Sequence, residues 1–297
     1  MSNTTRIGIV GIGAMGLAMA RNLHARGYPL RVRDIAPQAV AEAAALGIEA
    51  CDTPAALAAC CDVLVIVVVD AAQIEAVLFG PGGVVHAAPA TRDQRLAVMV
   101  CSTIAAHDTE GFAERLKPHA IDLMDAPISG GPVRAADGSM SMMLACDPAL
   151  RARHDTLLRD LAAKLFFIGP KVGDAARTKL VNNLLAGVNL VAAAEAMALG
   201  AQLGLDRQTL FDVINASSGA SWIGQDRMAR ALAGDYAPRA RAVILTKDVT
   251  LAVQMADAAG IETRLGNAAL SVFKATVASG LGEQDDAAVV KAIWPGF

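Results

Sequence analysis

Aromatic residues, positive charge and paired cysteines are all scarce in this chain of 297 residues. Phe, Trp and Tyr make up 4% of it, and the formal net charge is -3 at pH 7. Without a basic patch or an aromatic surface for base stacking, the composition gives nucleic-acid binding no support. The five cysteines form an odd set with no C-x-x-C pair. We therefore expect reduced thiols in a cytoplasmic protein, without a disulfide framework or zinc site.

Histidine is also uncommon, and none of the five histidines lies in a recognisable motif with a carboxylate. We expect all of them to be structural or surface residues, and we expect no metal site. An uninterrupted apolar run long enough to cross a bilayer is missing too. The stretch 184–205 comes near that length but contains Asn189, Glu195 and Gln202. We interpret it as a buried helix, and we expect no membrane partner.

Apolar residues are abundant, at 54% of the chain, and its length favours two domains. Residues 1–169 alternate strand and helix patterns, which predicts an α/β Rossmann domain with a doubly wound, mostly parallel sheet. Beyond them only helical periods recur, punctuated by glycines. Residues 170–297 are therefore predicted to form an all-α domain for substrate binding and oligomerisation, joined to the first by a long interdomain helix that begins near Ala175.

A glycine-rich segment, Gly11-Ile12-Gly13-Ala14-Met15-Gly16, lies between a buried-strand pattern and a helix pattern. In that context Gly11 makes a tight turn, Gly13 lets the backbone approach a pyrophosphate, and Gly16 lets helix and strand pack closely. Asp34 ends the second strand pattern, 18 residues after Gly16. A carboxylate there can accept the ribose hydroxyls and would repel a 2′-phosphate. The segment therefore predicts dinucleotide binding, with NAD favoured over NADP.

Two further strand patterns end in segments that we predict to contact the cofactor. Val68 and Val69 end the pattern over residues 62–69 and Asp70 follows it, and Ser102-Thr103 follows the next pattern. Ligands of doubly wound sheets bind at the carboxyl ends of the strands, which places both segments near the nucleotide. Ser102 could instead only cap the following helix, an alternative that the sequence leaves open. Residues 86–95, between these strands, are expected to form a loop.

Two more segments carry groups suited to a small carboxylic acid. Ser129-Gly130-Gly131 follows a strand end, and its bare backbone N–H groups can face a carboxylate, although a flexible turn is the alternative. Lys179 and Asn183 lie four residues apart at the start of the predicted long helix, and so on one of its faces. An amine beside an amide suits proton transfer. For this pair alone, a snorkelling lysine on a solvated first turn is the simpler interpretation.

Taken in order, these segments resemble the β-hydroxyacid dehydrogenase family, which includes 3-hydroxyisobutyrate dehydrogenase. The resemblance covers almost the whole chain. The motifs that carry it are residues 9–16, 125–131 with Asp137-Gly138, 173–183, and Lys247-Asp248. One departure is that Val68-Val69 stands where the family usually has Leu-Pro before Asp70.

The resemblance implies a role for each matching residue. Ser129, Gly130 and Gly131 would bind the substrate carboxylate, and Lys179 would be the catalytic acid/base. Asn183 would orient the substrate. Lys247 would lie near the cofactor or the substrate, supported by Asp248. Residues 217–222 would form a wall of the substrate pocket, although Trp222 could equally be a core residue.

Within the family, residues 184–188, 194–198 and 282–291 are most similar to L-threonate dehydrogenases, which implies a C4 sugar acid as substrate. A reductase of tartronate semialdehyde or succinic semialdehyde remains an alternative, as does a non-catalytic dinucleotide-binding protein. An imine reductase would not need Lys179 with a carboxylate-binding loop, and the further signals of an FAD domain are missing. The wide apolar surface expected of the helical domain predicts a homodimer or homotetramer.

Overall fold

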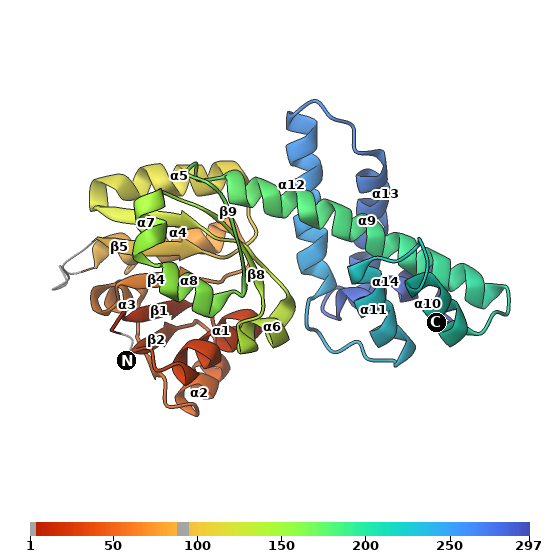
Figure 1. The fold of residues 1–297 in the computed structure, drawn as a ribbon, viewed down its shortest axis with the longest axis horizontal. Coiled ribbons are helices and arrows are strands. Elements are labelled where there is room, and N and C mark those ends of the chain that lie inside the picture. Colours follow the sequence, from red (N-terminus) through yellow and green to blue (C-terminus); the bar gives the residue numbers. More distant parts are fainter. Residues whose placement is uncertain (1–3, 88–94) are drawn as a thin grey trace. The chain divides into compact units, whose positions relative to one another are not determined.

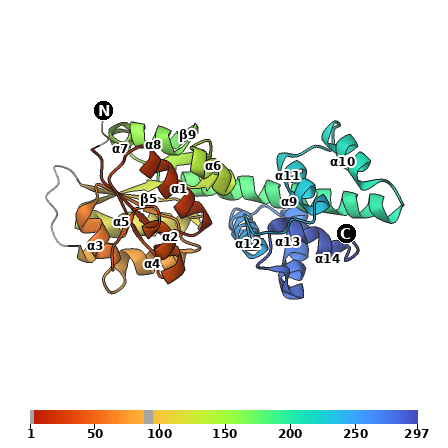
Figure 2. The same cartoon turned by 90° about the horizontal axis from the view of Figure 1, so that it is seen from below.

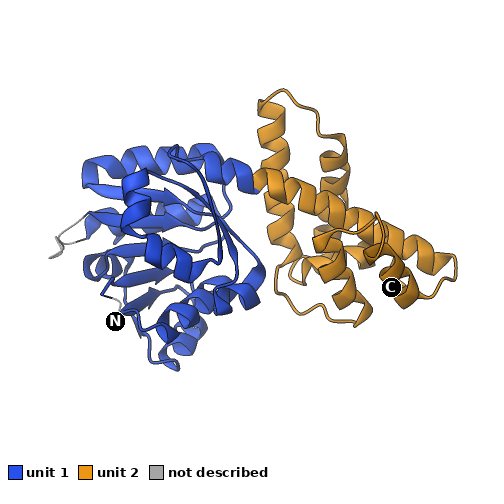
Figure 3. Ribbon diagram, in the orientation of Figure 1, with its two compact units in different colours: residues 1–179 blue, residues 180–297 orange. Residues whose placement is uncertain are grey.

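The computed structural model describes residues 4–87 and 95–297, which form two compact units, Met1–Lys179 and Leu180–Phe297 (Figure 3). Most of the predicted loop 86–95 lies outside the described residues. The division falls after Lys179 rather than after Gly169, because unit 1 also includes the first turns of helix α9 (Asp174–Gln202). Asp125 of unit 1 holds those turns by accepting hydrogen bonds from backbone N–H groups near the start of α9.

Unit 1 is built on a single sheet (Figure 1). Its strands are β1 (Ile7–Val10), β2 (Leu30–Arg33), β3 (Glu49–Ala50), β4 (Val63–Ile66), β5 (Leu96–Val100), β6 (Ile121–Asp125), β7 (Ile128–Ser129), β8 (Ser141–Ala145) and β9 (Lys164–Gly169). The order β3-β2-β1-β4-β5-β6 is parallel throughout. Strand β8 then pairs antiparallel with β6 and β7, and parallel with β9. This confirms the predicted doubly wound, mostly parallel sheet.

Helices cover both faces of the sheet because its strands direct alternate side chains into two apolar cores (Figure 2). On β1, Ile7 and Ile9 enter one core and Val10 enters the other. The first core is covered by α1 (Ala14–Ala25), α2 (Pro37–Ala44), α6 (Gly131–Asp137), α7 (Pro148–Arg153) and α8 (Asp155–Leu161). The second is covered by α3 (Pro54–Cys60), α4 (Ala71–Phe79) and α5 (Ala106–Leu116), with short 3-10 turns at η1 (Val84–His86) and η2 (Lys117–His119).

Unit 2, which the structure describes in full, contains helices and no strand, as predicted. After α9 come α10 (Arg207–Asn215), α11 (Trp222–Leu232), α12 (Ala242–Ala258), α13 (Arg264–Thr276), the π-helical turn η3 (Val277–Leu281), the 3-10 turn η4 (Asp286–Ala288) and α14 (Val289–Ile293). Their core gathers around Phe273, Val249 and Leu190. The helical segment near the C-terminus is divided into η4 and α14, because Asp285 accepts a hydrogen bond from Ala287 N–H and begins a separate 3-10 turn.

Helix α9 is long and apolar enough to cross a membrane, judged by length and composition alone. One of its faces carries Leu190, Ala194 and Met197 into the core of unit 2. On the other face, Leu185 and Leu199 are 61% and 62% exposed. The interpretation of this stretch as a buried helix is therefore right for one face and wrong for the other.

Candidate active site

The glycine-rich loop fits the pyrophosphate of a dinucleotide. Gly11 has a φ of 85°, and a side chain there would overlap the carbonyl group of Val67. A side chain at Gly16 would overlap the carbonyl oxygen of Gly11, so α1 needs a glycine to pack against the turn. A Cβ added at Gly13 would meet no atom within 4 Å, so the backbone there is open to a ligand. Gly13 is also the N-cap of α1 and makes no side-chain cap bond, so the first N–H groups of α1 suit a phosphate.

Asp34 lies beside this loop, directly after β2. One of its carboxylate oxygens accepts a hydrogen bond from Ile12 N–H at 2.7 Å, and the other accepts from Ala36 N–H at 2.8 Å. A carboxylate oxygen can accept more than one hydrogen bond, so both remain able to accept from ribose hydroxyls. The bond to Ile12 was not predicted, and it means that Asp34 also holds the glycine loop in place.

The two remaining predicted cofactor segments meet at the ends of β4 and β5. Ser102 Oγ accepts a hydrogen bond from Val68 N–H at 3.0 Å. The first helix after Ser102 has Ala105 as its N-cap, so Ser102 is not its cap and the open alternative is wrong. Asp70, in contrast, is the N-cap of α4 and accepts from Gln73 N–H at 2.9 Å. Its side chain has a structural task whether or not it also contacts a nucleotide.

The predicted carboxylate-binding segment joins β7 to α6, because Gly130 is the N-cap of α6 and Gly131 is its first residue. Gly130 and Gly131 have φ angles of 133° and 73°, which favour glycine, and Ser129 ends β7. A Cβ at Gly131 would meet nothing within 4 Å, so the backbone there is open to a ligand. Lys179 belongs to the same unit, and only 6% of it is exposed. The interpretation of Lys179 as a snorkelling surface residue is therefore wrong.

In unit 2, Asp248 of α12 joins two of the predicted site residues. Its Oδ2 accepts a hydrogen bond from Asn183 Nδ2 at 2.7 Å, and its Oδ1 accepts from Lys247 Nζ at 2.7 Å. Asn183 in turn accepts from the amide of Asn182 at 3.0 Å, which fixes the plane of its side chain. Asp248 was expected to support Lys247. Its bond to Asn183 was not foreseen, because the two residues lie 65 positions apart.

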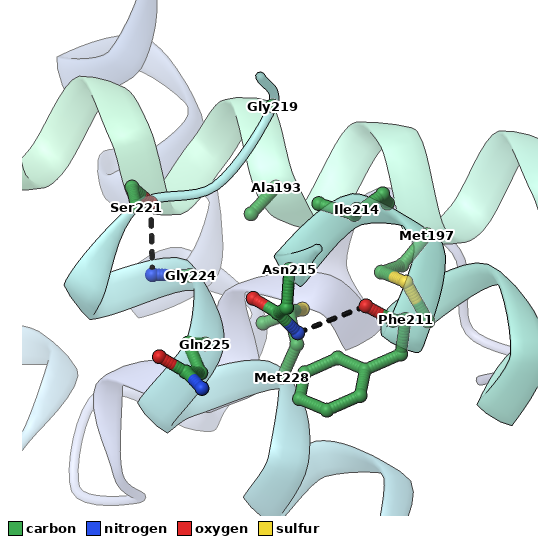
Figure 4. Close-up of a pocket in the computed structure, with 10 residues that line it drawn as sticks. All are labelled: Ala193, Met197, Phe211, Ile214, Asn215, Gly219, Ser221, Gly224, Gln225 and Met228. Carbon is green, nitrogen blue, oxygen red and sulfur yellow. Dashed lines mark hydrogen bonds between the residues drawn. The ribbon is translucent and has the colours of Figure 1, made fainter. Parts of the chain in front are cut away.

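A hollow of about 240 Å³, including space open to solvent, lies in unit 2 (Figure 4). It is lined by Ala193, Met197, Phe211, Ile214, Asn215, Gly219, Ser221, Gly224, Gln225 and Met228. None of the residues predicted to bind the cofactor, to bind the substrate or to transfer the proton lines it. Two residues of the segment predicted to form a wall of the substrate pocket, Gly219 and Ser221, line this hollow. Trp222 of that segment is 53% exposed, so the alternative of a core tryptophan is wrong.

Among the described residues, no group of three or more His, Cys, Asp or Glu side chains could hold a metal ion.

Two family models cover nearly all of this chain. The model for the NAD-binding domain of 6-phosphogluconate dehydrogenase matches residues 6–169. The model for the NAD-binding region of NADP-dependent 3-hydroxyisobutyrate dehydrogenase matches residues 173–293. The two matches meet within a few residues of the predicted boundary at 169–170.

Individual proteins give the same result over the full length. An L-threonate dehydrogenase of Cupriavidus necator is 38% identical over 98% of this chain and 96% of its own. An NAD-dependent L-serine dehydrogenase of Pseudomonas aeruginosa is 30% identical over 98% of both chains. The crystal structure of a 3-hydroxyisobutyrate dehydrogenase from Salmonella typhimurium superposes with a TM-score of 0.88, at 37% identity, over 97% of this chain and 99% of that one.

Proposed function

Because this chain belongs to the β-hydroxyacid dehydrogenase family, we propose that it oxidises a C4 sugar acid such as L-threonate with NAD. The family and the enzyme class follow from the family models and from full-length relatives that are dehydrogenases. The choice of acid is supported by L-threonate dehydrogenases at 38% and 37% identity. The observation that carries the chemistry is the buried Lys179, held in the same unit as the nucleotide loop and Ser129-Gly130-Gly131.

Each group in the proposed reaction has one task. Bound NAD supplies the hydride acceptor. The backbone N–H groups of Ser129-Gly130-Gly131 hold the substrate carboxylate and so set the distance to the reacting carbon. Lys179 Nζ takes the hydroxyl proton during oxidation, returns it during reduction, and stabilises negative charge on the oxygen in between. Asn183, held by its hydrogen bond to Asp248, would orient the substrate through its amide.

A substrate panel tests this function. The purified chain is incubated with L-threonate, 3-hydroxyisobutyrate, glycerate, 4-hydroxybutyrate and L-serine, each with NAD and with NADP, and the absorbance of the reduced cofactor is followed. We expect the highest kcat/KM with L-threonate. A preference for L-serine would favour the activity of the relative from P. aeruginosa instead. NADH binding without turnover of any acid, or of a semialdehyde in the reverse direction, would identify a non-catalytic dinucleotide-binding protein.

We also propose that NAD is preferred over NADP, and that Asp34 causes the preference. The variant Asp34→Ala loses the hydrogen bonds that the ribose hydroxyls donate to a charged acceptor, each worth about 1.5–3 kcal/mol, so NAD affinity should fall about tenfold or more. NADP affinity should rise or stay constant, because the repulsion of its 2′-phosphate is removed. Fluorescence titration with NADH and NADPH measures both, and Glu49→Ala on neighbouring β3 is the control. Equal weakening for both nucleotides would mean that Asp34 only holds the loop through Ile12.

A homodimer or homotetramer is proposed from an apolar stripe on unit 2. Val181, Leu185, Leu199 and Leu203 are each more than half exposed, and their spacings of 4, 14 and 4 residues place them on one helical face. Four large exposed apolar side chains in line suit a second copy of the chain. The double variant Leu185→Glu/Leu199→Glu should therefore be monomeric in light scattering. Val133→Glu, an equally exposed residue of unit 1, is the control, and an unchanged mass of the double variant would exclude the stripe.

A cytoplasmic location is proposed because the cysteines are unpaired and at least two of their thiols have raised pKa values. All five cysteines are free. Burial raises the pKa of Cys51 to about 11 and that of Cys146 to about 12, so neither thiol is ionised appreciably at neutral pH. Unreactive and unpaired thiols are typical of a reducing compartment.

A further inference from the structure

Asp125 is a buried carboxylate to which the proposed chemistry gives no task. It is the last residue of β6, and only 1% of it is exposed. Its Oδ2 accepts hydrogen bonds from Gly173 N–H at 2.8 Å and from Ala176 N–H at 3.1 Å. Both donors lie at the start of α9, whose first N–H groups have no partner within the helix. A strand residue therefore caps a helix whose preceding residue, Gly173, lies 48 positions later in the chain.

Burial disfavours the charged form of the Asp125 carboxylate, and the backbone hydrogen bonds that it accepts favour that form. Burial raises the pKa of Asp125 to about 6, although the hydrogen bonds from Ala176 and Gly173 favour the ionised form. The N-terminus of α9 favours a negative charge at the same point. At neutral pH the group is therefore mainly ionised, and its two hydrogen bonds are charge-assisted and strong.

Asp125 connects the two parts of the proposed site that belong to unit 1. Ser129, the first residue of the carboxylate-binding segment, follows it by four positions in the chain. Ala176, which it holds, precedes Lys179 by three positions, or about 4.5 Å along the helix axis. One side chain thus links the segment expected to bind the substrate to the turn of α9 that carries the lysine.

A second contact at the same turn is weaker. Arg177 pairs with Glu110 of α5 at 2.7 Å, but the two side chains are 39% and 35% exposed. Ion pairs that face solvent contribute little to holding two elements together. The buried hydrogen bonds of Asp125 are therefore the principal anchor of the start of α9.

We propose that Asp125 is a positioning residue, which fixes the start of α9 against β6 and thereby sets where the amine of Lys179 lies relative to Ser129-Gly130-Gly131. This inference rests on the proposed function, because it assumes that Lys179 transfers the proton. A misplacement of about 1 Å at a reacting group can lower a rate about 100-fold. Asp125 therefore acts on the rate through Lys179, without touching the substrate.

The test compares two variants of Asp125 in the full chain, with the best acid of the substrate panel. Asp125→Ala leaves both N–H groups without an acceptor, and its kcat should fall about 100-fold, with KM and the NADH dissociation constant within about threefold of the wild type. Asp125→Asn keeps a carbonyl oxygen that can accept both bonds, so it should recover at least about tenfold of the lost kcat. Glu110→Gln, which removes the charge of the exposed anchor, should retain the kcat of the wild type.

Two results would overturn the proposal. One is a wild-type kcat in Asp125→Ala, with NADH binding and thermal unfolding showing that the variant is folded. The other is an Asp125→Asn variant no better than Asp125→Ala, because the negative charge and not the hydrogen bonds would then be what matters. If Asp125→Ala does not fold, the kcat of Asp125→Asn decides alone: a value within about tenfold of the wild type supports the proposal, and a larger loss overturns it.

A failure of the proposed function can be distinguished from a failure of the proposal for Asp125. It would show as a wild-type protein that turns over no acid in the panel. The anchor would then be tested by hydrogen exchange of the peptide covering residues 173–183. Faster exchange in Asp125→Asn or Asp125→Ala than in Glu110→Gln would support the anchor, and equal exchange would overturn it.

Discussion

Replacing Lys179 by alanine should lower kcat at least about 100-fold while the NADH dissociation constant stays within about twofold of the wild type. The loss is expected because no other described residue of the proposed site offers an amine at that turn of α9, and general acid/base catalysis contributes about 100-fold to 10,000-fold. Cofactor binding should persist because the glycine loop and Asp34 lie on other elements. Single-turnover measurement of NADH formation with the preferred acid gives the comparison.

Two further lysine variants sharpen this result. Lys179→Arg keeps the positive charge but cannot release its proton near neutral pH, so it should remain inactive if proton transfer is the task. Substantial recovery in Lys179→Arg would indicate that charge alone is needed. Lys171→Ala removes an exposed lysine just before α9 and should leave kcat unchanged. Turnover by Lys179→Ala at the rate of the wild type would remove the assignment of Lys179.

Replacing Asp285 by alanine should destabilise unit 2 by about 3–5 kcal/mol, the usual cost of breaking a buried ion pair by removing one partner. Asp285 is fully buried, and its Oδ2 accepts from Arg230 Nη1 at 2.8 Å, from Arg239 N–H at 3.0 Å and from Ala240 N–H at 3.1 Å. Removing the carboxylate leaves these two backbone donors, and also Ala287 N–H, without an acceptor. It also leaves the guanidinium of Arg230, which is 13% exposed, with one anionic partner fewer.

The measurement is the urea-unfolding transition of the variant, followed by circular dichroism. Asp235→Ala is the matched control, because its salt bridge with Arg239 at 2.7 Å is between side chains 35% and 42% exposed. That variant should change stability by less than about 1 kcal/mol. If both variants shifted the transition equally, Asp285 would not be the centre of the network. The expected difference follows from the burial of Asp285 and from its larger number of backbone donors, since both carboxylates have an arginine partner.

Much of unit 1 could be predicted because its patterns are local. A buried strand, the glycine turn, a helix and Asp34 all lie within one unit of the chain, and each has a chemical reason for its spacing. Strands β8 and β9 were not identified. Their sequences are Ser-Met-Met-Leu-Ala and Lys-Leu-Phe-Phe-Ile-Gly, and the pairing of β8 with β6 and with β9 depends on distant parts of the chain.

The candidate site divides in the same way. The sequence alone shows that Lys179 and Asn183 lie four residues apart, and it predicts that they share one face, because a helix places residues four apart on one face. That Lys179 is buried rather than snorkelling could not be read from the pair, since burial depends on what packs against that face. The hydrogen bond of Ser102 to Val68 likewise depends on two strands being neighbours in the sheet.

The order of elements and the nucleotide loop were therefore set by local sequence patterns, which backbone geometry and glycine sterics enforce over a few residues. The partners of the buried carboxylates were settled only by folding. Asp125 reaches α9 across 48 positions, and Asn183 reaches Asp248 across 65. Such contacts depend on sheet register and helix packing, which bring together residues that no short period connects.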